Sequence, residues 1–168
     1  MTSATDLVTL TGHASLTGNL PSDALIRLDA SALTVTRGAL FSLAGGSTLN
    51  VTGDLVRLLN GSSLTLMNGP LLSLSGDSNV GTISGALVAY GAGSNTLSIT
   101  NRLCPCTLYG GIPVAVNGSP TISITNPIKN LNLGGTLNIQ FSNPVLTQGG
   151  TALVVVNGTS NSLTVRGQ

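Results

Sequence analysis

The sequence ALFSLAGGSTLNVTG (39–53) is followed by DLVRLLNGSSLTLMNG (54–69), and both blocks show one pattern of apolar and turn-forming residues. The pattern also occupies ALIRLDASALTVTRG (24–38) before them, and PLLSLSGDSNVGTISG (70–85) and ALVAYGAGSNTLSITN (86–101) after them. Each block contains two short apolar alternations separated by a cluster of Gly, Ser, Asn or Asp. Because apolar residues two positions apart point to the same face of a strand, each block predicts two β-strands.

The regularity of the blocks predicts a parallel β-solenoid rather than a helical or antiparallel fold. Period-two spacing gives no helical stripe, and turn residues recur too often for a helix to propagate. In a solenoid, equivalent positions of successive coils stack on one another, so we expect each block to form one coil. The expected internal ladder is Leu28, Leu43, Leu58 and Leu74. In the fourth block Ile83 comes one position late, which predicts a β-bulge.

The pattern extends beyond the five blocks, which predicts one all-β solenoid domain over residues 1–168. Residues 6–18, 111–126 and 151–167 match the pattern. We therefore expect a single-stranded parallel β-helix of about eight or nine coils, each of 15–16 residues. Residues 102–110, RLCPCTLYG, interrupt the period and predict a loop insertion.

The composition argues against several classes of function. The chain is 41% hydrophobic but only 2% aromatic, with no Trp, which disfavours stacking platforms for sugars or bases. Charged residues make up 7%, and the formal net charge is +1. The six Lys and Arg residues are spread singly along the sequence, so we expect no nucleic-acid binding.

The same composition favours an extracellular or cell-surface location. No apolar run approaches the ~20 residues that a membrane-spanning helix needs, so membrane insertion is not expected. The first residues, MTSATDLVTLTG, lack the charged and apolar regions of a secretion signal. A solvent-facing surface of Ser, Thr, Asn and Gly with few charges is more typical outside cells.

The motif Cys104-Pro105-Cys106 is the most unusual local feature of the sequence. Three interpretations remain open: a structural loop pair, a local or intermolecular disulfide, and half of a metal site. The only histidine, His13, lies far away and is expected to be a solvated turn residue. We therefore expect no metal ion and no cofactor.

The aspartates are candidate catalytic groups, because many solenoid enzymes cleave polysaccharides with carboxylates. Such hydrolysis needs two carboxylates a few ångströms apart in a groove. Asp29 and Asp77 are expected at turns well separated along the stack, and Asp23 and Asp54 at the opposite corner. With no two expected on adjacent coils of one face, the sequence does not predict an enzyme.

Outward-pointing polar residues are expected to form rows on one face of the solenoid. The predicted row contains Thr34, Thr36, Asn50, Thr52, Thr65, Ser98, Thr100, Ser123 and Thr125. A flat array of this kind resembles the ice-binding surface of solenoid antifreeze proteins. Asn50 and the exposed position of Met67 interrupt the threonine pattern, and threonine is also a common strand residue.

The blocks GGSTLNVTG (45–53) and NGSSLTLMNG (60–69) resemble the repetitive β-helix segments of large bacterial surface proteins. The families that this repeat style resembles are the filamentous-haemagglutinin-like exoproteins and autotransporter passengers. The resemblance implies export to the bacterial surface and a role in adhesion or scaffolding. It transfers no functional residues.

Neither end of the repeat pattern contains a polar cap or an amphipathic helix. Either the segment belongs to a longer solenoid, or its ends stack head to tail on other copies, which produces filaments. We therefore expect a non-enzymatic structural or adhesive extracellular module that assembles end to end. Its expected partners are itself and other surface components. The alternative is an ice- or surface-binding solenoid that uses the outward polar row.

Overall fold

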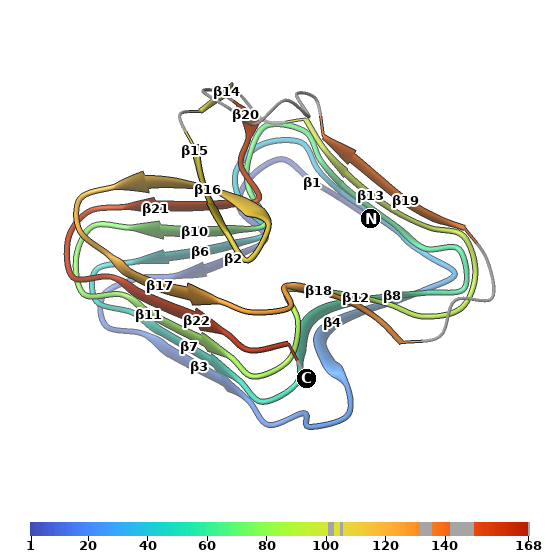
Figure 1. Cartoon of the computed structure of the whole chain (residues 1–168), viewed down its shortest axis with the longest axis horizontal. Coiled ribbons are helices and arrows are strands. Elements are labelled where there is room, and N and C mark those ends of the chain that lie inside the picture. Colours follow the sequence, from blue (N-terminus) through green and yellow to red (C-terminus); the bar gives the residue numbers. More distant parts are fainter. Residues whose placement is uncertain (101–102, 105, 132–135, 142–149, 168) are drawn as a thin grey trace.

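The structure, a computed structural model, describes residues 1–100, 103–104, 106–131, 136–141 and 150–167. Within these ranges the chain is all-β, contains no helix, and pairs its strands mostly in parallel (Figure 1). This arrangement is compatible with a β-solenoid.

Four sheets, named A to D here, contain nearly all of the described strands. In spatial order, sheet A consists of β1 (Thr2–Ser3), β5 (Ala32–Val35), β9 (Ser63–Leu66), β13 (Asn95–Ile99) and β19 (Leu137–Phe141). Sheet B consists of β15 (Cys106–Tyr109), β16 (Ile112–Asn117), β21 (Val154–Asn157), β10 (Leu72–Ser75), β6 (Phe41–Ala44) and β2 (Val8–Leu10).

The two other large sheets have the same construction. Sheet C consists of β17 (Thr121–Ile124), β22 (Ser162–Val165), β11 (Val80–Ile83), β7 (Thr48–Val51) and β3 (Ser15–Gly18). Sheet D consists of β18 (Ile128–Asn130), β12 (Val88–Tyr90), β8 (Asp54–Leu59) and β4 (Ala24–Asp29). A short antiparallel pair joins β14 (Leu103–Cys104) to β20 (Gly150–Thr151).

Between residues 8 and 99 the chain passes through sheets B, C, D and A in that order, three times. We call each passage a circuit. Each strand pairs in parallel with its equivalent in the next circuit, as β6 does with β10 and β7 with β11. In Figure 1, sheets B and C face each other on the left, and sheets A and D face each other on the right.

A circuit consists of two sequence blocks, so the predicted coil of 15–16 residues is wrong. Leu43 pairs with Leu74, whereas Leu28 pairs with Leu58 on a different sheet. Within residues 1–100, side-chain hydrogen bonds between neighbouring circuits join residues 31 to 35 positions apart. The physical reason is that one block supplies only two of the four sheets. The expected single ladder of four leucines is therefore two ladders.

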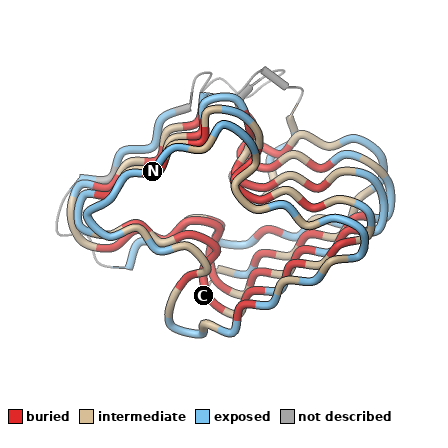
Figure 2. Tube along the Cα trace, turned by 180° about the vertical axis from the view of Figure 1, so that it is seen from behind, coloured by how far each residue is buried: buried red, intermediate tan, exposed pale blue. Residues whose placement is uncertain are grey.

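Inward-pointing aliphatic side chains form one core between the sheets. Leu43, Leu58 and Leu74 are each 0% exposed, and the buried residues alternate with exposed ones along the trace in Figure 2. Full burial of each such side chain contributes about 1.5–3 kcal/mol before entropy is considered. The alternation predicted from the sequence is thus present in the described strands.

The fourth block contains no shift in register, so the predicted bulge is also wrong. Val80 pairs with Thr48 and points outward, and Ile83 pairs with the buried Val51. Gly81 occupies the inward position in place of a leucine. A Cβ on Gly81 would lie 2.9 Å from Cδ1 of Leu163, so the glycine makes room for that side chain.

Polar side chains link successive circuits at two corners. At the corner between sheets B and C, the Ser47 N–H donates to Asn79 Oδ1, and the Asn79 N–H donates to Asn161 Oδ1. At the corner between sheets D and A, the Ser62 N–H donates to Asn95 Oδ1 at 3.0 Å. Because Asn79, Asn95 and Asn161 are buried, these bonds satisfy groups that would otherwise destabilise the fold.

The insertion predicted at residues 102–110 departs from the repeat, but its described part is not simply a loop. Strand β15 pairs antiparallel with β16, Tyr109 opposite Ile112, through a turn at Gly110 and Gly111. Strand β15 is thereby the last strand at one edge of sheet B.

Candidate functional site

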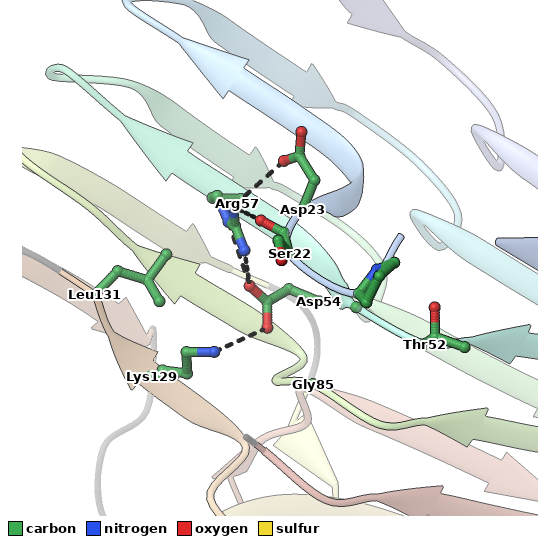
Figure 3. Close-up of a pocket in the computed structure, with 10 residues that line it drawn as sticks. Ser22, Asp23, Thr52, Asp54, Arg57, Gly85, Lys129 and Leu131 are labelled. Atoms are coloured by element: carbon green, nitrogen blue, oxygen red, sulfur yellow. Dashed lines mark hydrogen bonds and ion pairs between the residues drawn. The ribbon is translucent and has the colours of Figure 1, made fainter. Parts of the chain in front are cut away.

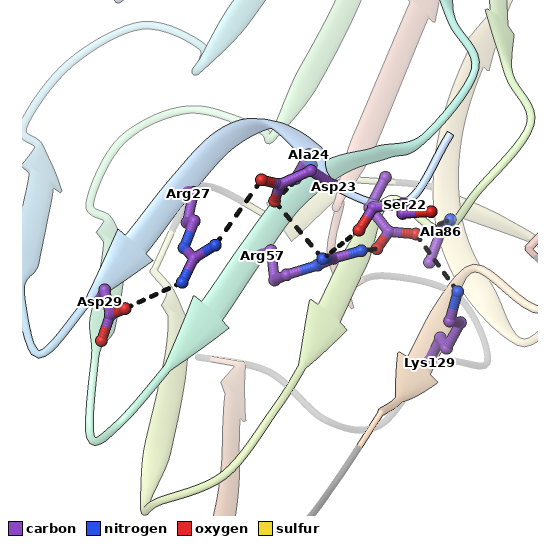
Figure 4. A network of polar contacts seen from close by, with 9 residues as sticks. Ser22, Asp23, Ala24, Arg27, Asp29, Arg57, Ala86 and Lys129 are labelled. Atoms are coloured by element: carbon purple, nitrogen blue, oxygen red, sulfur yellow. Dashed lines mark hydrogen bonds and ion pairs between the residues drawn. The ribbon is translucent and has the colours of Figure 1, made fainter. Parts of the chain in front are cut away.

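Six charged residues gather on the outer face of sheet D and at the corner that leads into it (Figure 4). Every ion pair that the structure gives between described residues lies there. The members are Asp23, Arg27, Asp29, Asp54, Arg57 and Lys129. We call this group the corner cluster. Arg27 pairs in register with Arg57, so basic residues that are spread singly in the sequence are neighbours in space.

Asp54, the first residue of β8, lies at the centre of the corner cluster. Its side chain is only 2% exposed. Its Oδ2 accepts hydrogen bonds from Nη2 and Nε of Arg57, at 2.7 and 3.3 Å. Its Oδ1 accepts the backbone N–H of Ala86 at 2.9 Å and lies 3.8 Å from Lys129 Nζ. The buried carboxylate thus holds three segments together, and such charges are tolerated only when they are paired.

Arg57 joins two carboxylates from successive circuits. Besides Asp54, its Nη1 donates to the carbonyl of Ser22 at 2.7 Å and to Asp23 Oδ1 at 3.4 Å. The Asp54 N–H also donates to the Asp23 carbonyl, which places the two aspartates at one corner in neighbouring circuits. The expectation that no two aspartates are adjacent is therefore wrong. The guanidinium lies between their carboxylates.

Arg27 extends the corner cluster along the exposed side of β4. Its guanidinium lies 3.1 Å from Asp29 and 3.6 Å from Asp23. The side chain of Asn60 donates to Asp29 at 2.7 Å. This bond from Asn60, followed by the bond from Arg27, lowers the pKa of Asp29, and the bond to Asp29 raises the pKa of Arg27. Both side chains are largely solvated, so solvent screens their contribution to stability.

A pocket of about 310 Å³ opens beside the corner cluster (Figure 3). Ser22, Thr52, Lys129 and Leu131 contribute to its wall. Both oxygens of Asp54 already accept hydrogen bonds, and Arg57 is engaged on both sides, so the ion pairs use most of the charge that the pocket offers. The arrangement is suited to tying β4, β8 and β18 together across the stack. Among the described residues, no group of three His, Cys, Asp or Glu is placed to hold a metal ion.

The structure divides the predicted outward polar row between two sheets. On sheet A or just beyond its strands lie Thr34, Thr36, Thr65, Ser98 and Thr100. On sheet C or just beyond its strands lie Asn50, Thr52, Ser123 and Thr125. The expectation of one continuous face is wrong for the same reason as the coil size, because successive blocks belong to opposite halves of a circuit.

Sheet C carries a polar array in two columns across its five strands, interrupted at Val80. One column is Thr17, Asn50, Thr82, Thr164 and Ser123. The other is Ser15, Thr48, Val80, Ser162 and Thr121. We call these columns the sheet C polar face. Neighbouring residues on it are ~4.8 Å apart between strands and ~6.7 Å apart along a strand.

The threonines that lie just beyond the strands of sheets A and C have a structural role instead. Thr36 donates through Oγ1 to the Ser3 carbonyl at 3.0 Å, and Thr100 donates to the Met67 carbonyl at 2.8 Å. Thr52 accepts the N–H of Leu20 at 2.8 Å. These hydroxyls bind backbone groups of a neighbouring circuit, so they are less available to a ligand than those of the sheet C polar face.

Cys106 is disulfide-bonded, and the only other cysteine in the chain is Cys104. Strand β14 contains Cys104, whose side chain lies outside the described part of the structure. His13 occupies a turn with a positive φ of 64° and lies next to Gly46, far from both cysteines in the sequence. The sulfur of Cys106, in the Cys104-Pro105-Cys106 motif, is therefore part of a disulfide bond.

Tyr90 is the one large polar side chain in the described part of the core, and it lies at the inward position that the apolar alternation predicted for it. It is 0% exposed, and its hydroxyl has no hydrogen-bond partner among the described residues. Burial raises the pKa of Tyr90 far above its ordinary value, because the phenolate would be desolvated. Tyr90 occupies the ladder position of Leu58 in the preceding circuit.

The corner cluster was missed by sequence reasoning, although a signal for it exists in the sequence. Asp23 and Asp54 recur at the spacing of two blocks, as do Arg27 and Arg57. A search at the two-block period places both pairs on one face, whereas the one-block period scatters them.

The described residues include no helix of the length and apolarity needed to cross a bilayer. Comparisons of the chain with protein-family models, with curated proteins and with solved structures each found no match.

Proposed function

We propose that this chain is a non-enzymatic structural or adhesive module of the bacterial cell surface, a single β-solenoid whose copies stack end to end. The observation that supports it is the incomplete burial of inward-pointing leucines on the terminal strands. Leu16 on β3 and Leu28 on β4 are only partly buried, whereas Leu49 and Leu58, their partners in the next circuit, are 0% exposed. A second copy that stacks on these strands would complete their burial.

The backbone of the same strands supports stacking. Strand β3 is the terminal strand of sheet C, and β4 is the terminal strand of sheet D. The carbonyls of Ala14 and Gly18 accept N–H groups from β7, so the intervening odd-numbered residues of β3 direct their backbone groups to the open edge. Open edges bind further strands readily. A head-to-tail contact of this kind propagates into a filament.

Two further observations are consistent with a surface location. Disulfides persist mainly in oxidising compartments, and Cys106 is disulfide-bonded. The ion pairs of the corner cluster leave little free charge to attract nucleic acid. The partner proposed here is a second copy of the chain, with other surface components as secondary partners.

The proposal is tested by sedimentation velocity and negative-stain electron microscopy of the full chain over a range of concentrations. We expect species that grow with concentration, and fibres at the highest. In Thr17→Pro the substituted residue loses an N–H that faces the open edge of β3, so this variant should stay monomeric without losing its pairing to β7. Thr17→Ser keeps the N–H and is the matched control. A wild-type chain that remains monomeric throughout contradicts the proposal.

A second candidate function, binding to ice or another ordered surface, is favoured by the sheet C polar face. The side chains of Thr17, Asn50, Thr82, Thr164 and Ser123 make no hydrogen bond to another described residue, so they are available to a ligand. Thermal hysteresis measurements test it. We expect activity in the wild type and its loss in Thr82→Lys, with Ser42→Lys, on the outer face of sheet B, as the control. Absence of hysteresis in the wild type excludes ice.

A further inference from the structure

The order of strands in sheets B and C differs from the order of the chain. In sheets A and D, β19 pairs directly with β13, and β18 pairs directly with β12. In sheets B and C, however, the later strands β21 and β22 lie between β10–β11 and β16–β17. Figure 1 shows β21 between β16 and β10. Strands β16 and β17 are thus separated from β10 and β11 by one strand position in each sheet. Residues 152–167, which contain β21 and β22, occupy that position.

Residues 152–167 form backbone hydrogen bonds with the strands on both sides. On one side, the Leu71 N–H donates to the Leu153 carbonyl, and the Arg166 N–H donates to the Ile83 carbonyl. On the other side, the Leu153 N–H donates to the Pro113 carbonyl. The inward residues Val154, Val156 and Leu163 are 0% exposed. We call the space that this segment occupies the slot.

Two side-chain contacts make the slot specific for this segment. Asn161 Oδ1 accepts both the N–H and the side-chain amide of Asn79 at 2.9 Å, and Asn161 Nδ2 donates to the Gly76 carbonyl at 2.7 Å. Asp77 Oδ1 accepts the N–H and the hydroxyl of Thr159, at 2.6 and 2.8 Å. A strand of unrelated sequence could form the backbone hydrogen bonds along the slot, but it would not provide the hydrogen-bond partners of both Asn79 and Asp77.

The slot also supports β16 and β17. Val114 pairs with Val154, and Ile122 pairs with Leu163, while neither β16 nor β17 pairs with β10 or β11 in the described structure. Residues 112–124 therefore lack a neighbour on that side until residues 152–167 are in place.

We infer that the slot accepts residues 152–167 of a second copy, so that chains are joined by exchange of this segment. An exchanged segment makes every contact of the original, because its hydrogen bonds and buried contacts do not depend on which chain supplies it. Exchange of this kind is a characteristic outcome when repeat proteins fold at high concentration. The second copy is the partner because Thr159 and Asn161 match Asp77 and Asn79. This interface is separate from the open edges of β3 and β4.

Cysteine cross-linking tests the exchange in the full chain. Ser73 and Val155 are register partners on the outer face of sheet B. A Ser73→Cys chain and a Val155→Cys chain are unfolded together, refolded over a range of concentrations and oxidised. We expect a disulfide-linked heterodimer whose yield rises with concentration, with the linked peptides identified by mass spectrometry. The double variant S73C/V155C, diluted, should form the bond within one chain and shows that the geometry permits it.

The matched control joins circuits that follow one another in the chain. Ser42 and Ser73 are also register partners on sheet B, but residues 41–75 form consecutive circuits and fill no slot. A mixture of Ser42→Cys and Ser73→Cys chains should therefore remain monomeric. If the double variant S73C/V155C closes within one chain while the mixed single variants yield no heterodimer at any concentration, the inference is wrong. Adding Thr17→Pro to each chain should prevent end-to-end fibres and leave the cross-link, which separates the two modes of assembly.

Discussion

Residues 8–99 and the described part of residues 111–167 both contain the repeat pattern but are assembled differently; these are called the first and the second region. In the first region every strand pairs with its equivalent one circuit away, and side-chain hydrogen bonds between circuits join residues 31 to 35 positions apart. Residues Asn161 and Thr159 of the second region instead bind Asn79 and Asp77 of the first, 82 positions away. The repeat pattern alone therefore does not decide which strands become neighbours.

The difference follows from the interchangeability of the repeat units. Each half-circuit presents aliphatic residues inward at period two, so the inward pattern alone does not specify which half-circuits become neighbours. In the first region chain connectivity selects the nearest neighbour, because short loops close at the lowest entropic cost. At the start of the second region the hairpin of β15 and β16 interrupts the repeat. The strands that follow β13 in sheets B and C, β16 and β17, do not pair with β10 and β11 but with the later strands β21 and β22. Polar contacts such as Asn79 with Asn161 then specify the pairing.

The largest expected effect comes from breaking the core of the first region. Leu58→Ala removes a fully buried side chain that pairs with Leu28 and Tyr90, and should lower the free energy of unfolding by about 2–5 kcal/mol. Urea unfolding measures it. Leu28→Ala, in the terminal strand of the same ladder, should cost less because Leu28 is only partly buried. Equal costs in dilute monomer would show that the terminal strand is as well packed as the centre.

A smaller and more local effect should follow from breaking the second region. Asn161→Ala leaves the buried N–H of Asn79 without a partner and removes one of the two hydrogen bonds of its side-chain amide, which still donates to the Ser75 carbonyl; the loss should cost about 1–3 kcal/mol. Amide hydrogen exchange should show lost protection in β21, β22, β16 and β17, with little change in β6 to β9. Asn95→Ala is the matched control, since Asn95 has the same role in the first region. Equal loss of protection in both regions would show that they unfold as one unit.

A gain in stability of about 1 kcal/mol is expected from Tyr90→Phe, which removes a buried hydroxyl without a described partner and keeps the ring. Tyr90 pairs with Leu58 in the first region and with Asn130 in the second, so the variant affects both. The thermal midpoint should rise. Tyr109→Phe, which alters a less buried tyrosine, is the control, and a fall in stability for Tyr90→Phe would mean that its hydroxyl is satisfied.

Local structure could be predicted from the sequence, and long-range order could not. The period-two spacing correctly indicated two strands per block and their inward residues, because these depend on nearby residues. The regular recurrence of the blocks indicated parallel pairing, but not which blocks pair. The circuit length was ambiguous, since Leu43 and Leu58 occupy equivalent positions in blocks that belong to opposite halves of a circuit. Only the sparse polar residues distinguish the two halves, as Asp23 and Asp54 do. In the fourth block Gly81 simulated a bulge because its missing side chain is replaced by Leu163.

The corner cluster and the slot needed the register of the strands before they could be recognised. Asp54, Arg57 and Lys129 meet because β8 and β18 both lie in sheet D, although β18 comes much later in the sequence. The insertion of residues 152–167 beneath residues 112–124 leaves no local sequence signal, because both segments match the repeat equally well. The single Cys104–Cys106 motif likewise left several interpretations open.

The smallest expected effect is a difference in acid sensitivity between the two regions. The backbone N–H of Thr159, and then its hydroxyl, lower the pKa of Asp77 below the ordinary 3.8. Since the pKa is lower in the folded chain than in the unfolded chain, the ionised carboxylate stabilises residues 152–167 above that value. This contribution disappears as the pH falls through the folded pKa. The amide signals of Val154 and Leu163 in NMR spectra should therefore report loosening on acidification, and Asp77→Asn should reduce the change.

Asp29 provides the counterpart in the first region, because the bond from Asn60, followed by that from Arg27, lowers its pKa too. Asp29→Asn should alter the acid response of the Leu28 and Leu59 amides and leave Val154 unaffected. Both carboxylates are largely solvated, so each effect should be modest and should weaken in high salt. If Asp77→Asn and Asp29→Asn changed the same set of amides, the two regions would share one acid transition. The segment in the slot would then have no independent opening, and its exchange between copies would require unfolding of the whole chain.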